Sequence, residues 1–528
     1  MKFAAGFPVR SIQACLDFAG IELADLDAVL PANRHHFLPR LAPRVLPETE
    51  HDYFGPQHKA WLYLQHAVSR GGALAWATEA LSRVLLRRRF PRLLDFVDHH
   101  TAHAHSAWLT SGWDDCVALT ADNMGDGWSA RVFGCSGGRA TFRYGSTARH
   151  SPGQFYGEIA QLLGYHNLMA GKVTGLAAHG NPQPCYAIME GLFGLDDDER
   201  SFVTPSLLWR SRKRPPYDEL LRHSPADVAA AAQKRLEDVM VAWVRRAVRE
   251  SGHSSAVLAG GVFANVVVNQ RILALPEVER VYVHPAMTDQ GISMGAGLCW
   301  LAENGGVVNR PLESIYLGPG YSEHQMGEAL EAARLPWERP VDLADTVAAA
   351  LQEGRVVARY DGRLEYGPRA LGNRSILYRS DDPAVNVWLN KMLRRTEFMP
   401  FAPVTLADHA AERYLGLAGG ELAMRYMTMT SRVTDLLRAE SPGVVHLDGT
   451  ARPQLVAEAD NPDYHAILQA FHRRTGVPTL INTSFNMHGE PIVCTPQDAV
   501  RAFQASGIER MVLGPFWVRN PVPARRPG

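Results

Sequence analysis

Four histidines lie close together in the first half of the chain. They are His99, His100, His103 and His105, directly after Asp98. If a helix begins at His99, then that residue and His103 project from the same face, and the other two histidines point elsewhere. Two neutral imidazoles on one face of a helix suit a divalent transition metal. Histidines that bind nothing can share this spacing, so the pair alone leaves both interpretations open.

Two aspartates could complete such a metal site. Asp122 follows the apolar run CVALTA (116–121), and Asp289 comes shortly after VYVHP (281–285). Each run predicts a buried strand, and ligands of open α/β sheets bind beyond the C-terminal ends of strands. Helix capping and Asx turns are the alternative roles for aspartate at these positions. A set of two imidazoles and two carboxylates is therefore one hypothesis for this region.

Three glycine-rich segments are candidates for binding phosphate. They are GDG (125–127), GKVTG (171–175) with Lys172, and the pair Gly260-Gly261, which leads into a predicted helix after Asn265. Glycine lets backbone N–H groups approach a phosphate closely, and the N-terminus of a helix favours negative charge. None of the three has the G-x-x-x-x-G-K-[ST] pattern, so ordinary turns are the alternative interpretation.

The C-terminal half contains an arginine-rich segment, RLEYGPRALGNRS (363–375), which includes Arg369 and Arg374. A loop stiffened by glycine and proline could hold guanidinium groups for bidentate contact with phosphate or carboxylate, and a solvated charged loop is the alternative. Arg452 in DGTAR and Asn482 in NTSFN offer further polar groups beside apolar runs. Their alternative role is turn formation.

Short apolar runs alternate with helical patterns along the chain, which is typical of an α/β protein. Strands are predicted at 93–97, 116–121, 256–260, 281–285, 356–360, 478–483 and 511–514, and helices at 9–20, within 57–86, from His99, at 226–251 and at 292–303. The stretch 305–322 is rich in glycine and proline and predicts a domain boundary.

The composition excludes several classes of protein. A chain of 528 residues is too long for a single small module. The 54 Lys and Arg residues balance the 55 Asp and Glu residues, so no general field attracts a nucleic acid or an anionic membrane. No segment is typical of a signal peptide or a membrane span, and the six cysteines form no C-x-x-C pair. We expect a cytoplasmic protein that binds neither nucleic acid nor membrane.

Taken together, five segments resemble the O-carbamoyltransferase family, which includes the nodulation-factor, tobramycin and cephem carbamoyltransferases. They are VDHHTAHAHSA (97–107), AGKVTGLAAHG (170–180), GGVFANVVVNQRIL (260–273), RLEYGPRALGNRSIL (363–377) and NTSFNMHGEPIV (482–493). The resemblance covers nearly the whole chain. It implies an actin-like ATPase domain of the threonylcarbamoyl-transferase type over residues 1–315, followed by a YrdC-like α/β domain over residues 316–528.

The resemblance also implies an activity. The second domain would use ATP, with Mg²⁺, to convert carbamoyl phosphate into carbamoyl adenylate. The first domain would pass the carbamoyl group to a hydroxyl of a small natural product or saccharide, as in the biosynthesis of secondary metabolites. A threonylcarbamoyl-type tRNA-modifying enzyme and a non-catalytic nucleotide-binding remnant are the alternatives.

Three sets of residues match functional positions of the family. The set that matches the metal ligands is His99, His103, Asp122 and Asp289. The set that matches the nucleotide-binding segments is Lys172, Gly260, Gly261 and Asn265. The set that matches the carbamoyl phosphate and ATP activation pocket is Arg369, Arg374, Arg452 and Asn482. The resemblance implies Fe²⁺ as the metal, and the ligand types would also accept Zn²⁺ or Mn²⁺.

One part of the family pattern has no counterpart in this chain. Family members begin with a strand pair that carries a His-Asp dipeptide, which supplies the general base for the acceptor hydroxyl. This chain starts at Met1-Lys2-Phe3, where Lys2 matches the end of the stretch that follows the strand pair. We therefore expect the first hairpin to be absent, and the resemblance assigns no catalytic base.

Overall fold

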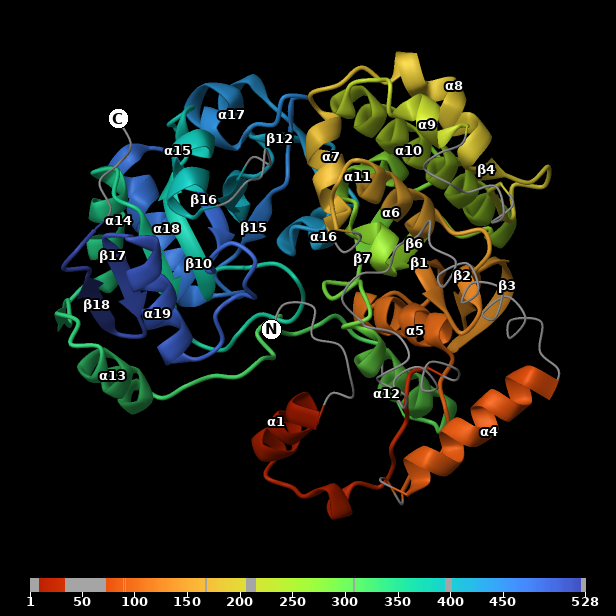
Figure 1. The fold of residues 1–528 in the computed structure, drawn as a ribbon. Helices are drawn as coiled ribbons and strands as arrows, with labels where there is room; N and C mark the ends of the chain where they lie inside the picture. The colour runs from red at the N-terminus through yellow and green to blue at the C-terminus, as the bar shows by residue number, and fades with distance from the viewer. Residues whose placement is uncertain are drawn as a thin grey trace. The chain divides into compact units, whose positions relative to one another are not determined.

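The computed structural model describes residues 9–33, 73–88, 90, 92–166, 169–205, 215–306, 309–394 and 401–523. They form two compact units, a first unit within Ala5–Leu312 and a second unit within Glu313–Gly528 (Figure 1). Both units combine helices with sheets, which confirms the predicted α/β class. Within the described residues, no helix combines the length and the apolar character that crossing a membrane needs.

The first unit is built on a five-stranded sheet with the strand order β3-β2-β1-β6-β7. Its strands are β1 (Cys116–Gly125), β2 (Trp128–Ser136), β3 (Arg139–Thr147), β6 (Ser255–Ala259) and β7 (Arg280–Val283). The first three form an antiparallel meander, whereas β6 runs parallel to β1 and β7 runs parallel to β6. Asp126 and Gly127 form the tight turn between β1 and β2, and both have the positive φ that such a hairpin turn requires.

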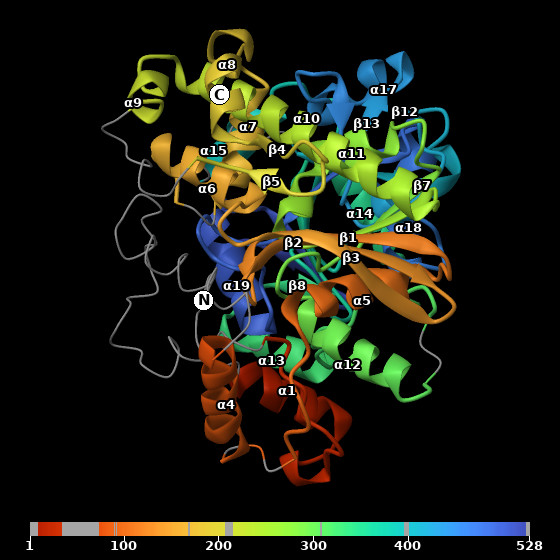
Figure 2. The same cartoon turned by 90° about the vertical axis from the view of Figure 1, so that its right-hand side faces the viewer.

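Helices cover both faces of this sheet, with α5 and α12 on one face and α6, α10 and α11 on the other (Figure 2). The described helices of the unit are α1 (Val9–Ala19), α4 (Ala73–Arg87), α5 (His99–Ser111), α6 (Pro152–Leu162), α7 (Gly171–Ala177), α8 (Gln183–Leu192), α9 (Tyr217–Leu220), α10 (Pro225–Ser251), α11 (Val266–Leu273) and α12 (Ile292–Glu303). A short hairpin joins β4 (Gly194–Leu195) to β5 (Phe202–Val203). α12 approaches α5 closely at Gly295, where a Cβ would lie 1.8 Å from the carbonyl oxygen of Ala102.

The second unit is built on an eight-stranded sheet with the order β15-β11-β16-β10-β9-β17-β18-β8. Its strands are β8 (Trp337–Glu338), β9 (Val357–Tyr360), β10 (Arg374–Arg379), β11 (Ala402–Leu406), β15 (Gln454–Val456), β16 (Thr479–Ser484), β17 (Arg510–Leu513) and β18 (Phe516–Arg519). A smaller sheet joins β12 (Tyr414–Leu415), β13 (Ser431–Val433) and β14 (Thr450–Ala451).

Two apolar cores flank the large sheet of the second unit. One is formed with α14 (Leu343–Gln352) and α18 (Pro462–Thr475), the other with α13 (Glu323–Ala332), α15 (Val385–Met392) and α19 (Pro496–Ser506). Two short helices, α16 (Glu421–Arg425) and α17 (Asp435–Glu440), complete the described helices. Because helices cover both faces, the central strands are apolar on both sides, as the runs in the sequence indicate.

Most predicted elements are confirmed. The predicted helices correspond to α1, α5, α10 and α12, and the predicted strands 256–260, 281–285, 356–360, 478–483 and 511–514 correspond to β6, β7, β9, β16 and β17. Helices are predicted within 57–86, and α4 confirms this prediction from residue 73 onward. Residues 57–72 lie outside the described part. The same holds for Met1–Phe3, on which the expectation of a missing hairpin depends.

Two predictions about strands are wrong. Residues 93–97 form no strand, because their pairing with residues 29–31 stops after the single bridge between Val29 and Leu93. Pro31 accepts a hydrogen bond from the backbone N–H of Val97 but has no N–H of its own to continue the ladder. The strand predicted at 116–121 does not end at residue 121. It is β1, which continues to Gly125, so Asp122 lies inside the strand rather than beyond it.

Candidate functional site

The helix α5 presents the two predicted metal-binding histidines to the sheet. It begins at His99 because Asp98 caps it, with a side-chain oxygen 2.9 Å from the backbone nitrogen of Thr101. His99 and His103 are fully buried, and their ring centroids lie 4.7 Å apart. They therefore share one face of the helix, as their spacing predicts.

The neighbouring histidines have other partners. The ring nitrogens of His100 lie 2.9 Å from Thr120 Oγ1 and 3.1 Å from the carbonyl oxygen of Trp128. His105 Nδ1 donates to the carbonyl oxygen of Thr101 at 2.8 Å. Both rings are therefore held by groups outside the metal site, which confirms the prediction that they point away from His99 and His103.

The structure brings His99, His103, Asp122 and Asp289 together at one point. Asp122 Oδ2 lies 3.3 Å from His103 Nε2 and 4.0 Å from His99 Nε2, and Asp289 Oδ1 lies 3.6 Å from both nitrogens. One ligand atom from each of the four residues lies within 4.8 Å of the others. The ring nitrogens of both histidines are buried and make no hydrogen bond within the described residues. Buried imidazole nitrogens facing two carboxylates fit a divalent metal ion, and the residues present can therefore hold one.

Backbone features position these ligands. The pairing of β1 with β2 shifts register between Ala121 and Gly125, and this irregularity contains Asp122. Gly125 leaves room for the metal-site histidine, because a Cβ there would lie 2.1 Å from the His99 ring. The backbone N–H of Gly261 donates to Asp122 Oδ2 at 3.0 Å and fixes that carboxylate. Asp289 lies in the loop before α12 and its side chain is 70% exposed, so it closes the group on the solvent side.

The protonation of His103 links metal binding to pH. Burial lowers the pKa of His103, but the nearby carboxylates of Asp122 and Asp289 outweigh burial and raise this pKa to about 9. Without metal, His103 therefore carries a proton at neutral pH, and a metal ion must displace that proton. We expect the affinity for a divalent metal to rise about tenfold per pH unit up to about pH 9 and then level off. Calorimetric titration of metal-free protein with cobalt(II) at several pH values measures this slope, and an affinity independent of pH would contradict it.

Two of the predicted nucleotide-binding residues, Gly260 and Gly261, lie beside Ala121 and Asp122 of β1. Gly260 has φ +103°, and a Cβ there would lie 2.2 Å from the Ala121 carbonyl oxygen, so only glycine fits beside β1. Asn265 caps α11 by accepting from the backbone N–H of Val268 at 3.3 Å. Lys172 is half-buried on α7, with Nζ 5.8 Å from the centroid of the Tyr165 ring.

A buried polar network joins α7 to Asn265, and it was not predicted from the sequence. Asn265 Nδ2 donates to Gln233 Oε1 at 2.8 Å and lies 3.5 Å from Thr174 Oγ1. The Tyr156 hydroxyl donates to Gln233 Oε1 at 2.5 Å, and Gln233 Nε2 donates to Glu237 Oε1 at 2.7 Å. Gln233 and Glu237 are four residues apart on the buried face of the predicted helix 226–251. Their polar character on that face is the signal that could have found them.

In the second unit, Arg369 and Arg452 form a pair of guanidinium groups without an acidic partner. Neither makes an ion pair or side-chain hydrogen bond within the described residues, and both Nε atoms are buried. Burial lowers the pKa of Arg369 to about 10. Burial and the charge of Arg369 lower the pKa of Arg452. Both side chains are half-buried, and two neighbouring positive charges without an acidic partner favour an anion between them, so we call this pair the anion pocket.

Arg374 has a different environment from Arg369, although both belong to the same arginine-rich segment. It is fully buried, lies 3.6 Å from the centroid of the Tyr360 ring, and donates to the carbonyl oxygens of Asp361 at 2.6 Å and Asn373 at 2.9 Å. These contacts hold the loop in place. The carboxylate of Glu365 anchors the same loop, because its Oε1 accepts backbone N–H groups of residues 371, 373 and 374. Arg374 therefore belongs to the framework that presents Arg369, and its role in ligand binding stays a prediction.

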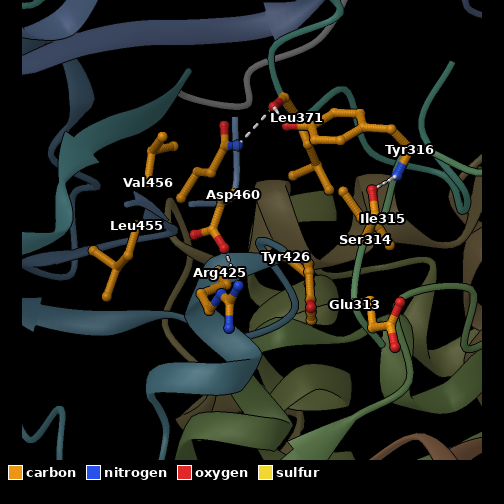
Figure 3. Close-up of a pocket in the computed structure, with 11 residues that line it drawn as sticks. Glu313, Ser314, Ile315, Tyr316, Leu371, Arg425, Tyr426, Leu455, Val456 and Asp460 are labelled. Carbon is orange, nitrogen blue, oxygen red and sulfur yellow. Dashed lines mark hydrogen bonds and ion pairs between the residues drawn. The ribbon is translucent and has the colours of Figure 1, made fainter. Parts of the chain in front are cut away.

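A small pocket opens near this loop in the second unit (Figure 3). Its lining includes Leu371, Gln454 and Tyr426, and the ion pair between Arg425 and Asp460 forms part of its wall. None of the site residues predicted from the sequence lines it. Gln454, which lines this pocket, lies two residues after Arg452 and accepts a hydrogen bond from Asn482 Nδ2 at 2.7 Å.

Comparison with known proteins places both units in one family. A family model described as the carbamoyltransferase N-terminus matches residues 5–298, and one described as the carbamoyltransferase C-terminus matches residues 348–520. The nodulation protein NolNO of Sinorhizobium fredii is 32% identical over 98% of this chain and 75% of its own length. The nodulation protein NolO of Bradyrhizobium diazoefficiens is 33% identical over 80% of this chain and 79% of its own length.

Among solved structures, HypF from T. kodakarensis matches 43% of this chain and 39% of its own with 14% identity and a TM-score of 0.29, which supports no structural argument. The sequence relatives and the two family models agree with the resemblance seen in the motifs. The chain belongs to the carbamoyltransferase family and is a transferase enzyme.

Proposed function

We propose that this protein is an ATP-dependent O-carbamoyltransferase. It takes the carbamoyl group from carbamoyl phosphate, activates it as carbamoyl adenylate, and transfers it to a hydroxyl of a small natural product or saccharide. The observation that carries this proposal is the pair Arg369 and Arg452, two half-buried guanidinium groups for which the described residues provide no acidic partner. In a carbamoyltransferase, phosphate-bearing substrates supply the anion that such a pair requires.

The two steps are assigned to the two parts of the chain. Residues 316–528 act as a YrdC-like activating domain, in which carbamoyl phosphate, ATP and water give carbamoyl adenylate, phosphate and pyrophosphate. Residues 1–315 act as an actin-like ATPase domain, in which the acceptor oxygen forms a bond to the carbamoyl carbon and AMP leaves. Confinement of the adenylate within one protein limits its hydrolysis.

The residues of the anion pocket neutralise phosphate charge during activation. Arg369 and Arg452 bind phosphate oxygens through N–H groups for which the described residues provide no acceptor. Glu365 and Arg374 keep the loop in one conformation, so the guanidinium groups need no rearrangement when the substrate binds. Mg²⁺ accompanies ATP.

In the first unit, His99, His103, Asp122 and Asp289 would hold a divalent metal, with Fe²⁺ as the proposed ion. Such an ion supplies a positive charge that stabilises a phosphate leaving group. Gly261 couples the two sites, since its N–H orients the Asp122 carboxylate and its neighbour Gly260 lies in the proposed nucleotide-binding segment. Lys172 and Asn265 complete that segment.

A transfer assay tests the proposal. The purified protein is incubated with ¹³C-labelled carbamoyl phosphate, ATP, Mg²⁺ and Fe²⁺, together with a panel of hydroxylated acceptors such as aminoglycosides and oligosaccharides. We expect the label to appear as a carbamate ester on one acceptor class, and only when ATP is present. Label found on an acceptor amine, or transfer that does not need ATP, would contradict O-transfer through an adenylate.

A further inference from the structure

Asn482 lies on the buried strand β16 and its amide orientation is fixed by the fold. The side chain is 1% exposed. Its Nδ2 donates to the backbone carbonyl oxygen of Ala370 at 3.1 Å and to Gln454 Oε1 at 2.7 Å. A backbone carbonyl can only accept a hydrogen bond, so the nitrogen of the Asn482 amide, and not its oxygen, must face Ala370.

A second amide confirms this orientation independently. Gln454 Nε2 donates to the backbone carbonyl oxygen of Leu371 at 2.7 Å. The same argument makes Gln454 present its oxygen to Asn482, where it accepts from Nδ2. Two consecutive backbone carbonyls, those of Ala370 and Leu371, therefore fix both amides in one chain of hydrogen bonds.

This arrangement leaves Asn482 Oδ1 as a buried acceptor without a donor. Within the described residues, Oδ1 makes no hydrogen bond. A buried carbonyl oxygen without a donor destabilises the folded protein, and native proteins rarely leave one in this state unless a ligand or water donates to it.

The Asn482 side chain joins the two segments that carry Arg369 and Arg452. Asn482 bonds to Ala370, the residue after Arg369, and to Gln454, two residues after Arg452. These two segments thus bring one unsatisfied acceptor, which suits an N–H donor, close in the chain to two guanidinium groups, which suit a phosphate. Carbamoyl phosphate carries both features in one small molecule. Acetyl phosphate has nearly the same shape and charge but has a methyl group in place of the amide nitrogen.

We infer that Asn482 Oδ1 accepts a hydrogen bond from the amide nitrogen of the carbamoyl group, and that Asn482 thereby selects carbamoyl phosphate against acyl phosphates. The inference rests on the proposed function. A methyl group cannot donate, so acetyl phosphate would bury Oδ1 without a partner, and sites built to bind an N–H reject analogues that lack it. Asn482 is therefore a specificity-determining residue of the activation step.

Binding of the two ligands tests this inference. Calorimetric titration of the full chain with carbamoyl phosphate and with acetyl phosphate, kept cold to limit hydrolysis, gives the ratio of their dissociation constants. We expect the wild-type protein to favour carbamoyl phosphate by at least about tenfold, a conservative bound for one lost hydrogen bond. Asn482→Leu should weaken carbamoyl phosphate to the level of acetyl phosphate and leave acetyl phosphate nearly unchanged.

Two further variants separate selectivity from structure. Gln454→Leu breaks the amide chain but keeps Asn482 Oδ1, so it should weaken both ligands by a similar factor and preserve their ratio. Asn520→Leu is the matched control: Asn520 is also buried and donates to two carbonyl oxygens, those of Phe503 and Ile508, but has no bond to the anion pocket. It should change neither affinity.

The possible failures are distinguishable. If the wild-type protein binds neither phosphate, the proposed function falls and the inference falls with it. If it binds both equally, or if Asn482→Leu weakens both by the same factor, the proposed function stands and the selectivity assigned to Asn482 is wrong. The wild-type comparison needs no variant, so it decides the inference even if Asn482→Leu does not fold.

Discussion

Arg452→Leu is expected to lower kcat/KM for carbamoyl phosphate by about 30-fold to several thousand-fold, because the loss of one partner of a desolvated charge pair costs about 2–5 kcal/mol. The reason is that Arg452 has no acceptor within the described protein and binds the substrate's phosphate instead. Initial rates of pyrophosphate release at saturating ATP measure the effect.

The same substitution should not destabilise the ligand-free protein. A guanidinium whose Nε is buried without an acceptor is unfavourable, so leucine at position 452 should leave the melting temperature unchanged or raise it. Arg374→Leu should do the opposite, since it removes the side-chain donor to the carbonyl oxygen of Asp361, at a cost of about 1–3 kcal/mol. The carbonyl oxygen of Asn373 loses the same donor but keeps the backbone N–H of Asp361.

An exposed arginine provides the control. Arg432 lies on β13 and faces solvent, and its register partner Thr450 is close in the chain to Arg452. Arg432→Leu should change neither the rate nor the melting temperature. A loss of activity in Arg452→Leu that tracks a loss of stability, or a fully active Arg452→Leu protein, would contradict the assignment of the anion pocket.

His103→Ala is expected to remove stoichiometric metal from the first unit. Changes in residues that only orient metal ligands lower affinity by about 10–100-fold, so loss of a direct ligand should lower it by at least about 100-fold. Metal content after expression and dialysis, measured by mass spectrometry, gives the result. His105→Ala is the matched control, because His105 is a buried histidine of the same helix that bonds to the Thr101 carbonyl instead.

Equal metal content in the wild-type protein and in His103→Ala would show that the four-residue group does not bind the ion. Loss of metal in both histidine variants would indicate a general defect of α5. The predicted pattern is loss in His103→Ala alone, accompanied by loss of carbamoyl transfer while carbamoyl adenylate still forms. The last point follows because the metal group and the anion pocket belong to different units.

The sequence predicts the class of the fold and most helices and strands because these follow local periodicity. It fails at residues 93–97, where an apolar run has the composition of a strand but its partner segment contains Pro31. It also misplaces the end of β1, because the register shift near Asp122 depends on pairing with β2, which is a tertiary event.

The candidate sites likewise combine features that local sequence determines with features that depend on tertiary contacts. The spacing of His99 and His103 fixes their common face, so helical geometry alone brings them together. The sequence could not assign different roles to Arg369 and Arg374, since both are arginines of one segment. Only the closed loop, anchored by Glu365, makes one of them a framework residue and leaves the other without a partner.

The proposed function depends on activation of carbamoyl phosphate with ATP by the second unit. The most direct measurement is the formation of AMP and pyrophosphate from ATP by the purified chain, with and without carbamoyl phosphate and without any acceptor. We expect pyrophosphate release to depend on carbamoyl phosphate and to fall sharply in Arg452→Leu but not in His103→Ala. Release that is independent of carbamoyl phosphate, or ATP cleavage to ADP instead, would contradict it.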